Sequence, residues 1–404
     1  MKRLICLLVL TFAANAALSQ GHIAPPAGPI PPYYFGLHIH HAASGTPWPS
    51  IPFHCWRLWD AGVSWEKLEP QRGVWNFDLL DKYIQFAQEH DVEVLLTLGQ
   101  TPTWASSRPQ DVVDTPHGNG ANAKPANLND WDDYVSTVAE RYKGKIQDYE
   151  IWNEPDQWHW WSGDIPTLVE MTRRARNIVR SIDPSARIVS PSVTAGGRPW
   201  LSEYLDDGGG EYIDVVGFHF YVAPKGPEQL LIAVPKVRNI MIDHGLQGMP
   251  LWDTEEGWGG SRTTFANTQE MAAYVSRALI MNWAAGVRRF FFYAYDNYDW
   301  SAIHMIDRTT KEPTEAATAY TTTESWLINA TMNSCTENSE GIFLCAMSRG
   351  SSHYWIVWST APGGRRSYEM PGGIRISTVT DLNGNATAVE NRTVEVAGGP
   401  VMVQ

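Results

Sequence analysis

The sequence contains little cysteine and lacks the motifs that commonly mark metal and dinucleotide sites. Its 404 residues include four cysteines, and neither a Cys-x-x-Cys pair nor a His-Glu-x-x-His motif occurs. These absences argue against a structural zinc site and against a zinc-dependent protease. A Gly-x-Gly-x-x-Gly turn is also missing after the first apolar strand-like run, and such a turn is typical of a dinucleotide-binding sheet. We therefore expect neither a metal nor a cofactor.

Basic residues are also scarce. Lys and Arg number 31 against 44 Asp and Glu, the net charge is −13, and basic residues cluster only in pairs such as Arg173-Arg174 and Arg365-Arg366. Nucleic acids and anionic membranes require a positive protein surface, so neither is an expected partner. The 19 tryptophans favour carbohydrate modestly, because aromatic rings stack on the apolar faces of sugars, although most tryptophans simply pack in a core.

The first 16 residues have the organisation of a secretory signal peptide. Met1-Lys2-Arg3 is a basic start, residues 4–12 are apolar, and Ala14-Asn15-Ala16 supplies the small residues of a cleavage site. A membrane anchor is the alternative, but this run is shorter than the roughly 20 residues that span a bilayer. We expect a secreted protein, extracellular or periplasmic, in which residues 17–33 form an extended lead-in.

Two of the other cysteines are expected to form a disulfide. Cys335 and Cys345 lie at the ends of a short, turn-rich stretch that fits one hairpin. Export permits their oxidation. Cys55 precedes an apolar strand, and we interpret it as a buried free thiol rather than a nucleophile.

Residues 34–328 alternate between strand-like and helix-like runs, which is typical of parallel βα units. The eight strand-like runs are 35–40, 56–59, 92–98, 146–152, 187–193, 214–221, 250–254 and 289–295. Helix-like runs include 165–182, 230–242, 270–285 and 315–327. Eight such units predict an α/β fold of the (β/α)₈ TIM-barrel type rather than an open doubly wound sheet. Residues 329–404 consist of short β-rich runs and predict a small antiparallel β-sheet or sandwich as an accessory domain.

Two of the barrel strands end at glutamate. The fourth ends Trp152-Asn153-Glu154-Pro155, and the seventh ends Trp252-Asp253-Thr254-Glu255-Glu256-Gly257-Trp258. Barrel enzymes carry their chemistry at the C-terminal ends of the strands. Two carboxyl groups about 5–5.5 Å apart across a barrel mouth can cleave a glycosidic bond with retention of configuration.

These motifs resemble the clan A glycoside hydrolases, and family 39 in particular. The resemblance extends over the whole barrel and includes Arg57-Leu58-Trp59-Asp60, the run Trp65 to Pro70, and Thr101-Pro102-Thr103-Trp104-Ala105. It implies that Glu154 is the general acid/base, that Glu255 is the nucleophile, and that Asn153 hydrogen-bonds the sugar 2-hydroxyl. Glu256 is the rival nucleophile, but the clan pattern places the nucleophile directly after Thr254.

Other strand residues are expected to support this pair. Period-two alternation sends His219 and Tyr221 to the same side of the sixth strand, where clan members contact the nucleophile and the sugar, and a half-buried core role is the alternative. Arg57 is expected near the nucleophile, and an ion pair with Asp60 or another barrel carboxylate is the alternative.

Substrate contacts are expected from histidines and tryptophans at the barrel mouth. His38 and His40 share one face of the first strand, so one is expected to contact sugar and the other to be structural; a metal site there is disfavoured for want of acidic or cysteine ligands. Trp104, Trp258 and Trp300 follow strand ends and are candidate sugar platforms, with rim packing as the alternative for each. Asp296 and Asp299 are further candidates, although aspartates in loops are commonly only turn residues.

The sequence thus predicts a secreted retaining β-glycoside hydrolase that acts on a β-linked oligosaccharide or polysaccharide. Two other functions fit the same barrel. A transglycosylase would use the same pair of glutamates, whereas a non-catalytic carbohydrate-binding barrel would have lost turnover.

Overall fold

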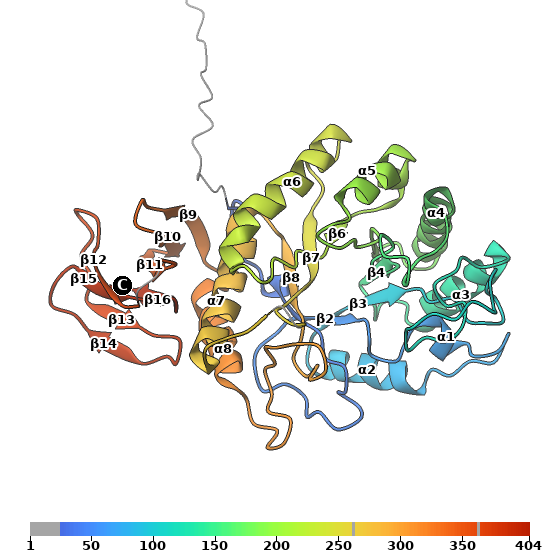
Figure 1. Cartoon of the computed structure of the whole chain (residues 1–404), viewed down its shortest axis with the longest axis horizontal. Coiled ribbons are helices and arrows are strands. Elements are labelled where there is room, and N and C mark those ends of the chain that lie inside the picture. Colours follow the sequence, from blue (N-terminus) through green and yellow to red (C-terminus); the bar gives the residue numbers. More distant parts are fainter. Residues whose placement is uncertain (1–24, 261–262, 362–363) are drawn as a thin grey trace, which may run out of the picture.

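Eight parallel strands form the barrel, and a separate antiparallel sheet follows in the chain, which confirms the predicted fold (Figure 1). The computed structural model describes residues 25–260, 263–361 and 364–404. The expected signal peptide, residues 1–16, therefore lies outside the described residues, as does the first part of the lead-in.

The barrel strands are short and their order is β5-β4-β3-β2-β1-β8-β7-β6. Their bounds are β1 Phe35–Leu37, β2 Cys55–Leu58, β3 Glu93–Leu98, β4 Asp148–Ile151, β5 Arg187–Val189, β6 Val216–Phe218, β7 Leu251–Glu256 and β8 Arg289–Phe292. Parallel bridges join Val189 to Val215 and Val193 to Phe218, so β5 meets β6 and the ring closes. Several of the predicted strands are longer than the observed ones, because the apolar runs in the sequence continue into the loops that follow.

The barrel helices are α1 Trp65–Leu68, α2 Asp78–Glu89, α3 Leu128–Arg141, α4 Ile165–Ile182, α5 Arg198–Asp206, α6 Leu230–Asp243, α7 Thr268–Ala285 and α8 Glu315–Leu327. Short 3₁₀ helices are η1 Pro32–Tyr34, η2 Gly209–Tyr212 and η3 Pro227–Gln229. Side-chain caps begin several helices: Asp164 accepts a hydrogen bond from the Thr167 amide, and Asn267 accepts one from the Glu270 amide. Such caps satisfy amide groups that have no partner in the first helical turn. Sequence reasoning missed α5, whose Gly197 and Pro199 read as a loop.

The interior of the barrel is arranged in layers. Period-two alternation turns every second strand residue inward. A lower apolar layer contains Cys55, Leu95, Val189, Val215, Trp252 and Phe291. Two residues further along their strands, Arg57 and Thr254 form part of a buried polar layer. The apolar layer therefore floors the polar layer at the mouth.

The lead-in is anchored rather than simply extended. The Ile30 amide donates to the Ala330 carbonyl, and Ile30 forms a parallel bridge with Ile328. Residues 32–34 then form a single 3₁₀ turn, which Pro32 initiates. This contact ties the start of the described chain to the junction between α8 and the C-terminal sheet.

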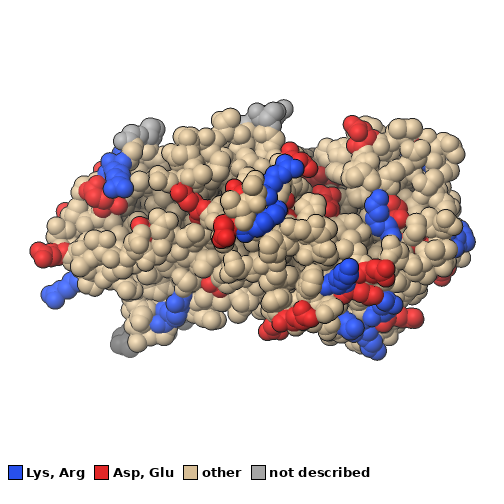
Figure 2. Space-filling model, turned by 90° about the horizontal axis from the view of Figure 1, so that it is seen from below, with Lys and Arg blue, Asp and Glu red and all other residues tan. Residues whose placement is uncertain are grey.

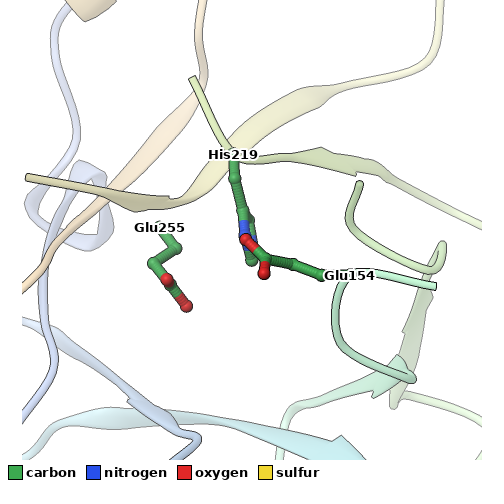
Figure 3. Close-up of side chains that lie close together, drawn as sticks. All are labelled: Glu154, His219 and Glu255. Carbon is green, nitrogen blue, oxygen red and sulfur yellow. The ribbon is translucent and has the colours of Figure 1, made fainter. Parts of the chain in front are cut away.

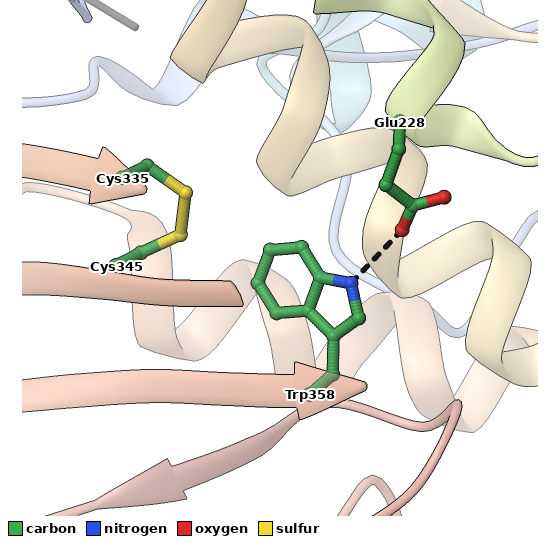
Figure 4. Close-up of a disulfide and its surroundings, with 4 residues drawn as sticks. All are labelled: Glu228, Cys335, Cys345 and Trp358. Atoms are coloured by element: carbon green, nitrogen blue, oxygen red, sulfur yellow. Dashed lines mark hydrogen bonds between the residues drawn. A yellow bond between two sulfur atoms is a disulfide. The ribbon is translucent and has the colours of Figure 1, made fainter. Parts of the chain in front are cut away.

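The C-terminal region contains a six-stranded antiparallel sheet and a two-stranded one. Its strands are β9 Thr331–Glu337, β10 Ile342–Arg349, β11 Ser352–Ser359, β12 Arg366–Glu369, β13 Thr378–Thr380, β14 Ala386–Ala388, β15 Thr393–Val396 and β16 Val401–Val403. Cys335 and Cys345 are cross-strand partners on β9 and β10 and form the predicted disulfide, whereas Cys55 is a buried free thiol. The Trp358 indole donates to Glu228, which attaches the sheet to η3 of the barrel (Figure 4).

Within the described ranges, none of the helices has the length and apolar character needed to cross a bilayer.

Arg289 supplies a test of the barrel floor. Its buried guanidinium donates to Asp148 at 2.9 Å and to Glu93 at 2.6 Å. We expect Arg289→Met to lower the free energy of unfolding by about 2–3 kcal/mol, because the buried Asp148 carboxylate loses one of its two guanidinium partners and only Arg187 remains. Urea denaturation measures the change.

The matched control for this prediction is Arg392→Met. Arg392 pairs with Glu369 on the surface, and both side chains are well exposed, so the cost should stay below about 1 kcal/mol. Equal destabilisation by the two substitutions would contradict the assigned role of Arg289.

Candidate active site

A cavity of about 760 Å³ opens at the C-terminal ends of the strands. The long loops after β1 and β8 extend on this side of the barrel, and Figure 2 shows the molecule from there, with charged side chains scattered over a largely uncharged surface. The lining residues include Asn153, Glu154, Tyr221 and Glu255. These four predicted site residues, together with His40 and Trp300, therefore share one cavity.

Glu154 and Glu255 face each other across this cavity. One carboxylate oxygen of each, together with a ring nitrogen of His219, lies within 4.8 Å of the other two atoms (Figure 3). Glu154 lies in the turn just after β4, Glu255 lies near the end of β7, and His219 directly follows β6. The convergence that the sequence motifs predict is thus present in the structure.

The backbone at the end of β4 is strained. Trp152 has φ +70° and Glu154 has φ +44°, a region that side chains larger than glycine rarely adopt. The Glu154 amide donates to the Ser192 carbonyl at 2.8 Å, and Asn153 bridges to Ser192. The neighbouring β5 loop thus holds the turn that presents both Asn153 and Glu154 to the cavity.

Arg57 and Tyr221 hold Glu255. Arg57 Nη1 donates to Glu255 Oε2 at 2.7 Å, and the Tyr221 hydroxyl donates to Oε1 at 2.7 Å. Arg57 Nη2 also donates to Asn153 Oδ1 at 2.8 Å, which leaves the Asn153 amide nitrogen free to face the cavity. Arg57 thus lies beside the nucleophile candidate, as expected, and it also pairs with a barrel carboxylate, Glu150. Because it is completely buried, it positions the groups that line the cavity rather than contacting substrate itself.

Glu150 is a functional residue that sequence reasoning missed. It is buried and accepts hydrogen bonds from Arg57, from Thr97 at 2.6 Å and from Ser192 at 2.5 Å. The sequence contained a signal for this residue, because Glu150 is a charged residue within a barrel strand and lies two positions before Trp152. Period-two alternation places it on the inward side of that strand. Its negative charge balances Arg57, so the guanidinium does not fully neutralise Glu255.

The surroundings of Glu154 favour the protonated form of its carboxyl group. Burial raises its pKa to about 8, with further contributions from the negative charges of Asp156 and Asp60, while Arg57 acts in the opposite direction. Burial also raises the pKa of Glu255, but His219, Arg57 and the Tyr221 hydroxyl oppose that rise. The two carboxyl groups are therefore electrostatically different, as an acid and a nucleophile must be.

His219 contacts Glu154 rather than the nucleophile. Its Nδ1 lies 2.9 Å from Glu154 Oε1, and its side chain is fully buried. His219 is not among the residues that line the cavity, so it supports Glu154, and its expected contact with the sugar stays a prediction. Burial lowers the pKa of His219 to about 4, so the ring is neutral at neutral pH.

Glu256, the rival nucleophile, lies on the opposite side of β7. A register shift between Asp253 and Glu256 turns both side chains outward, where the Asn282 amide of α7 donates to Glu256 at 3.0 Å. Burial raises the pKa of Asp253 to about 7 and that of Glu256 well above its ordinary value. This pair belongs to the barrel-helix interface, and Glu255 alone of the two glutamates faces the cavity.

The three candidate platform tryptophans lie in different surroundings. Trp300 lines the cavity, is 42% exposed and packs edge-on against Tyr221 and Tyr293. Trp258 is completely buried, and its indole donates to the Lys225 carbonyl. Trp104 turns back to donate to the Glu69 carbonyl and lies outside the cavity lining. The platform prediction is therefore wrong for Trp104 and Trp258, because their loops direct both rings into packing.

The histidines and aspartates near β1 and β8 divide in the same way. His38 is fully buried and contacts the Thr254 carbonyl, so it is the structural member of the pair, whereas His40 lines the cavity and is the one that can contact sugar. Asp296 is buried and accepts hydrogen bonds from the amides of His40 and His41, which makes it a turn residue. Asp299 lines the cavity.

Several lining residues were not assigned a role from the sequence. They include Trp59, Tyr293, Asn297 and Arg308. These four lie in loops after β2 and β8, where no period reveals which side chains turn inward. Trp59 directly follows β2, and its position just past a strand end was the available signal. His159 and Trp160 also line the cavity, in agreement with the expectation from the sequence that the cluster Trp158 to Trp161 shapes the binding site.

The cluster of Glu154, His219 and Glu255 is also the group that could hold a metal ion among the residues that the structure describes. Its donor atoms are already engaged with Arg57, Tyr221 and each other. A guanidinium 2.7 Å from Glu255 repels a second cation there. The contacts therefore fit an acid-nucleophile pair better than a metal centre.

Comparisons with known proteins find similarity to glycoside hydrolases. The Glycosyl hydrolase family 10 profile matches residues 60–162. A β-xylosidase of Geobacillus stearothermophilus is 25% identical over 51% of this chain and 45% of its own length. The endo-1,4-β-xylanase A of Halalkalibacterium halodurans is 33% identical over 22% of this chain and 24% of its own length.

Solved structures share the fold. A family 39 glycoside hydrolase from Bacteroides cellulosilyticus superimposes with a TM-score of 0.73 at 17% identity, covering 92% of this chain and 81% of that one. A family 39 β-xylosidase from Caulobacter crescentus gives 0.64 at 15% identity, covering 94% and 97%. The chain is thus similar in sequence to family 10 glycoside hydrolases over residues 60–162 and to a β-xylosidase, and it shares its fold with family 39 structures.

The chain spans less than half the length of the curated relatives described above. The matched segment of family 10 nevertheless contains Asn153 and Glu154. The sequence resemblance and the fold thus agree, with the barrel as the shared unit.

Asp156 provides a direct test of the electrostatics. We expect Asp156→Asn to lower the pKa of Glu154 from about 8 toward the ordinary glutamate value, because a neighbouring negative charge is removed. Asparagine can still accept the hydrogen bond from the Thr194 amide, so the loop should persist. A carbon-13 NMR titration of labelled glutamate carboxyl groups measures the shift.

Asp206→Asn serves as the control, since Asp206 pairs with His244 on the surface. An unchanged Glu154 titration in Asp156→Asn would contradict this account of the site.

Proposed function

We propose that the chain is a secreted, retaining β-glycoside hydrolase that cleaves a β-linked oligosaccharide or polysaccharide by double displacement. The observation that supports this most is the separation of Glu154 and Glu255, whose nearest donor atoms lie within 4.8 Å. Retaining enzymes hold their carboxyl groups about 5–5.5 Å apart, whereas inverting enzymes leave about 6.5–9.5 Å for a water molecule.

In the first step, Glu255 attacks the anomeric carbon as the bond to the leaving oxygen breaks, and Glu154 gives that oxygen its proton. In the second step, Glu154 takes a proton from water, the water oxygen bonds to the anomeric carbon, and Glu255 is released. An Nδ1–H tautomer of His219 donates to Glu154 Oε1 and leaves Oε2 to carry the transferred proton. No cofactor takes part in either step.

The sugar in the cleaved position lies against the nucleophile. Asn153, oriented by Arg57, offers its amide to the 2-hydroxyl, an interaction that strengthens in the transition state. Trp300, supported by Tyr221 and Tyr293, offers an exposed aromatic face beside Glu255. Because the relatives are named β-xylosidase and endo-1,4-β-xylanase, β-linked xylose is the first glycone to test.

Two other functions use the same cavity. A transglycosylase would pass the sugar to another sugar instead of water, and a carbohydrate-binding barrel would bind without turnover. A time course on aryl β-xyloside and β-glucoside separates the three, because it yields free sugar, larger products or no release. The intact pair of glutamates favours hydrolysis or transfer over binding alone.

Glu255→Ala should reduce turnover by more than about 10⁴-fold, because no group can then form the glycosyl intermediate. Added azide should enter the vacated space, restore activity and give a glycosyl azide of inverted configuration. Chromogenic release and NMR of the product measure both effects. Glu256→Gln is the matched control and should keep most activity, provided that circular dichroism shows it folded; the reverse result for the two variants would overturn the nucleophile assignment.

Glu154→Ala should separate substrates by their leaving groups. A poor leaving group needs the proton from Glu154, so its hydrolysis should fall by about 10²–10⁴-fold. The first step on an activated aryl glycoside should be affected much less. Steady-state and burst kinetics on a series of aryl glycosides measure this dependence, and an equal loss for every leaving group would argue against the acid role.

A further inference from the structure

Trp158 exposes an indole that the chemistry above does not use. Its side chain is 69% exposed, which makes it the most exposed tryptophan among the large hydrophobic residues of the described chain. Single exposed hydrophobic residues are common and do not by themselves indicate a binding site. The surroundings of Trp158 are what distinguish it.

The backbone around Trp158 is firmly held although its ring is not. The Trp158 carbonyl accepts a hydrogen bond from the Asn122 side chain at 2.8 Å, and the Trp160 carbonyl accepts one from the Trp152 indole at 2.8 Å. The Ser162 amide donates to the Asn122 carbonyl at 2.8 Å. An exposed ring on a fixed backbone is pre-organised, so a ligand that covers it incurs little ordering cost.

The loop that carries Trp158 begins at the general acid. His159 and Trp160 line the cavity, and the rings of Trp158 and His159 lie 6.3 Å apart, so the exposed indole continues the cavity wall outward. An acid that protonates the leaving oxygen has to lie on the leaving-group side of the cleaved bond. Trp300, in contrast, is beside Tyr221 and the nucleophile, on the side of the sugar that is transferred.

We propose that Trp158 is a stacking platform for a sugar on the leaving-group side, one unit beyond the sugar that contacts His159 and Trp160. The preferred substrate is then a β-linked glycan with at least two sugars on that side, which favours internal cleavage of a chain over removal of single sugars from small glycosides. This inference rests on the proposed glycosidase function. An aromatic face suits an uncharged sugar because it buries the apolar face of the ring.

The test compares short and long substrates in the full-length protein. We expect Trp158→Ala to lower kcat/KM about 10-fold on xylotetraose to xylohexaose, or on the equivalent cello-oligosaccharides, the loss typical of one stacking contact. Activity on p-nitrophenyl β-xyloside and β-glucoside should stay within about twofold of the parent protein, because neither substrate reaches the platform. Trp158→Phe should restore most of the loss, since it keeps an aromatic face.

Trp200→Ala is the matched control, because Trp200 stacks on Tyr204 of α5 and lies outside the cavity lining. Fluorescence titration of the same oligosaccharides into Glu255→Gln measures binding without turnover. In that background, adding Trp158→Ala should weaken the binding of long oligosaccharides but not of short ones. Equal effects on short and long substrates, or no effect on either, would overturn the platform. Absence of turnover with retained, Trp158-dependent binding would instead overturn the hydrolase function and leave the platform standing.

Discussion

The site depends on one buried guanidinium. Arg57 is enclosed by the barrel and donates to Glu150, Asn153 and Glu255. A buried charge costs several kcal/mol unless it is paired. Two carboxylates around one guanidinium leave one net negative charge, so the positive charge of Arg57 is shared between Glu150 and Glu255 and does not fully neutralise Glu255. Glu150 is thus as necessary to this balance as Arg57, although it never reaches the cavity.

The layering of the barrel makes that balance possible. Below Arg57, Cys55 and its apolar neighbours close the interior to water, and above it the rings of Tyr221, Tyr293 and Trp300 cover the wall beside Glu255. Charge interactions are stronger where water is excluded. The same alternation of inward residues that packs the barrel therefore also places the polar layer where its electrostatics are strongest.

The sequence predicted the barrel and the two facing glutamates because strand periodicity and strand ends are local patterns, and the resemblance named the roles. At β7 the choice of Glu255 over Glu256 came from the resemblance alone, because no composition signal reveals the bulge that turns Glu256 outward. The prediction failed where the path of a loop decides orientation. Trp104 and Trp258 also follow strand ends, but their loops fold back and bury them. Distance from a strand end does not specify which way a loop side chain points.

The contrast between the two glutamates also explains how one residue can serve as acid and then as base. Glu154 has no cation in direct contact, and its pKa is raised by burial and by the negative charge of Asp156. Glu255, in contrast, accepts hydrogen bonds from Arg57 and Tyr221. Each carboxylate raises the pKa of the other through like-charge repulsion. When Glu255 becomes a neutral ester in the proposed intermediate, that repulsion disappears, and Arg57 and Glu150 are left with no net charge. The pKa of Glu154 then falls, and it is ready to accept a proton from the attacking water.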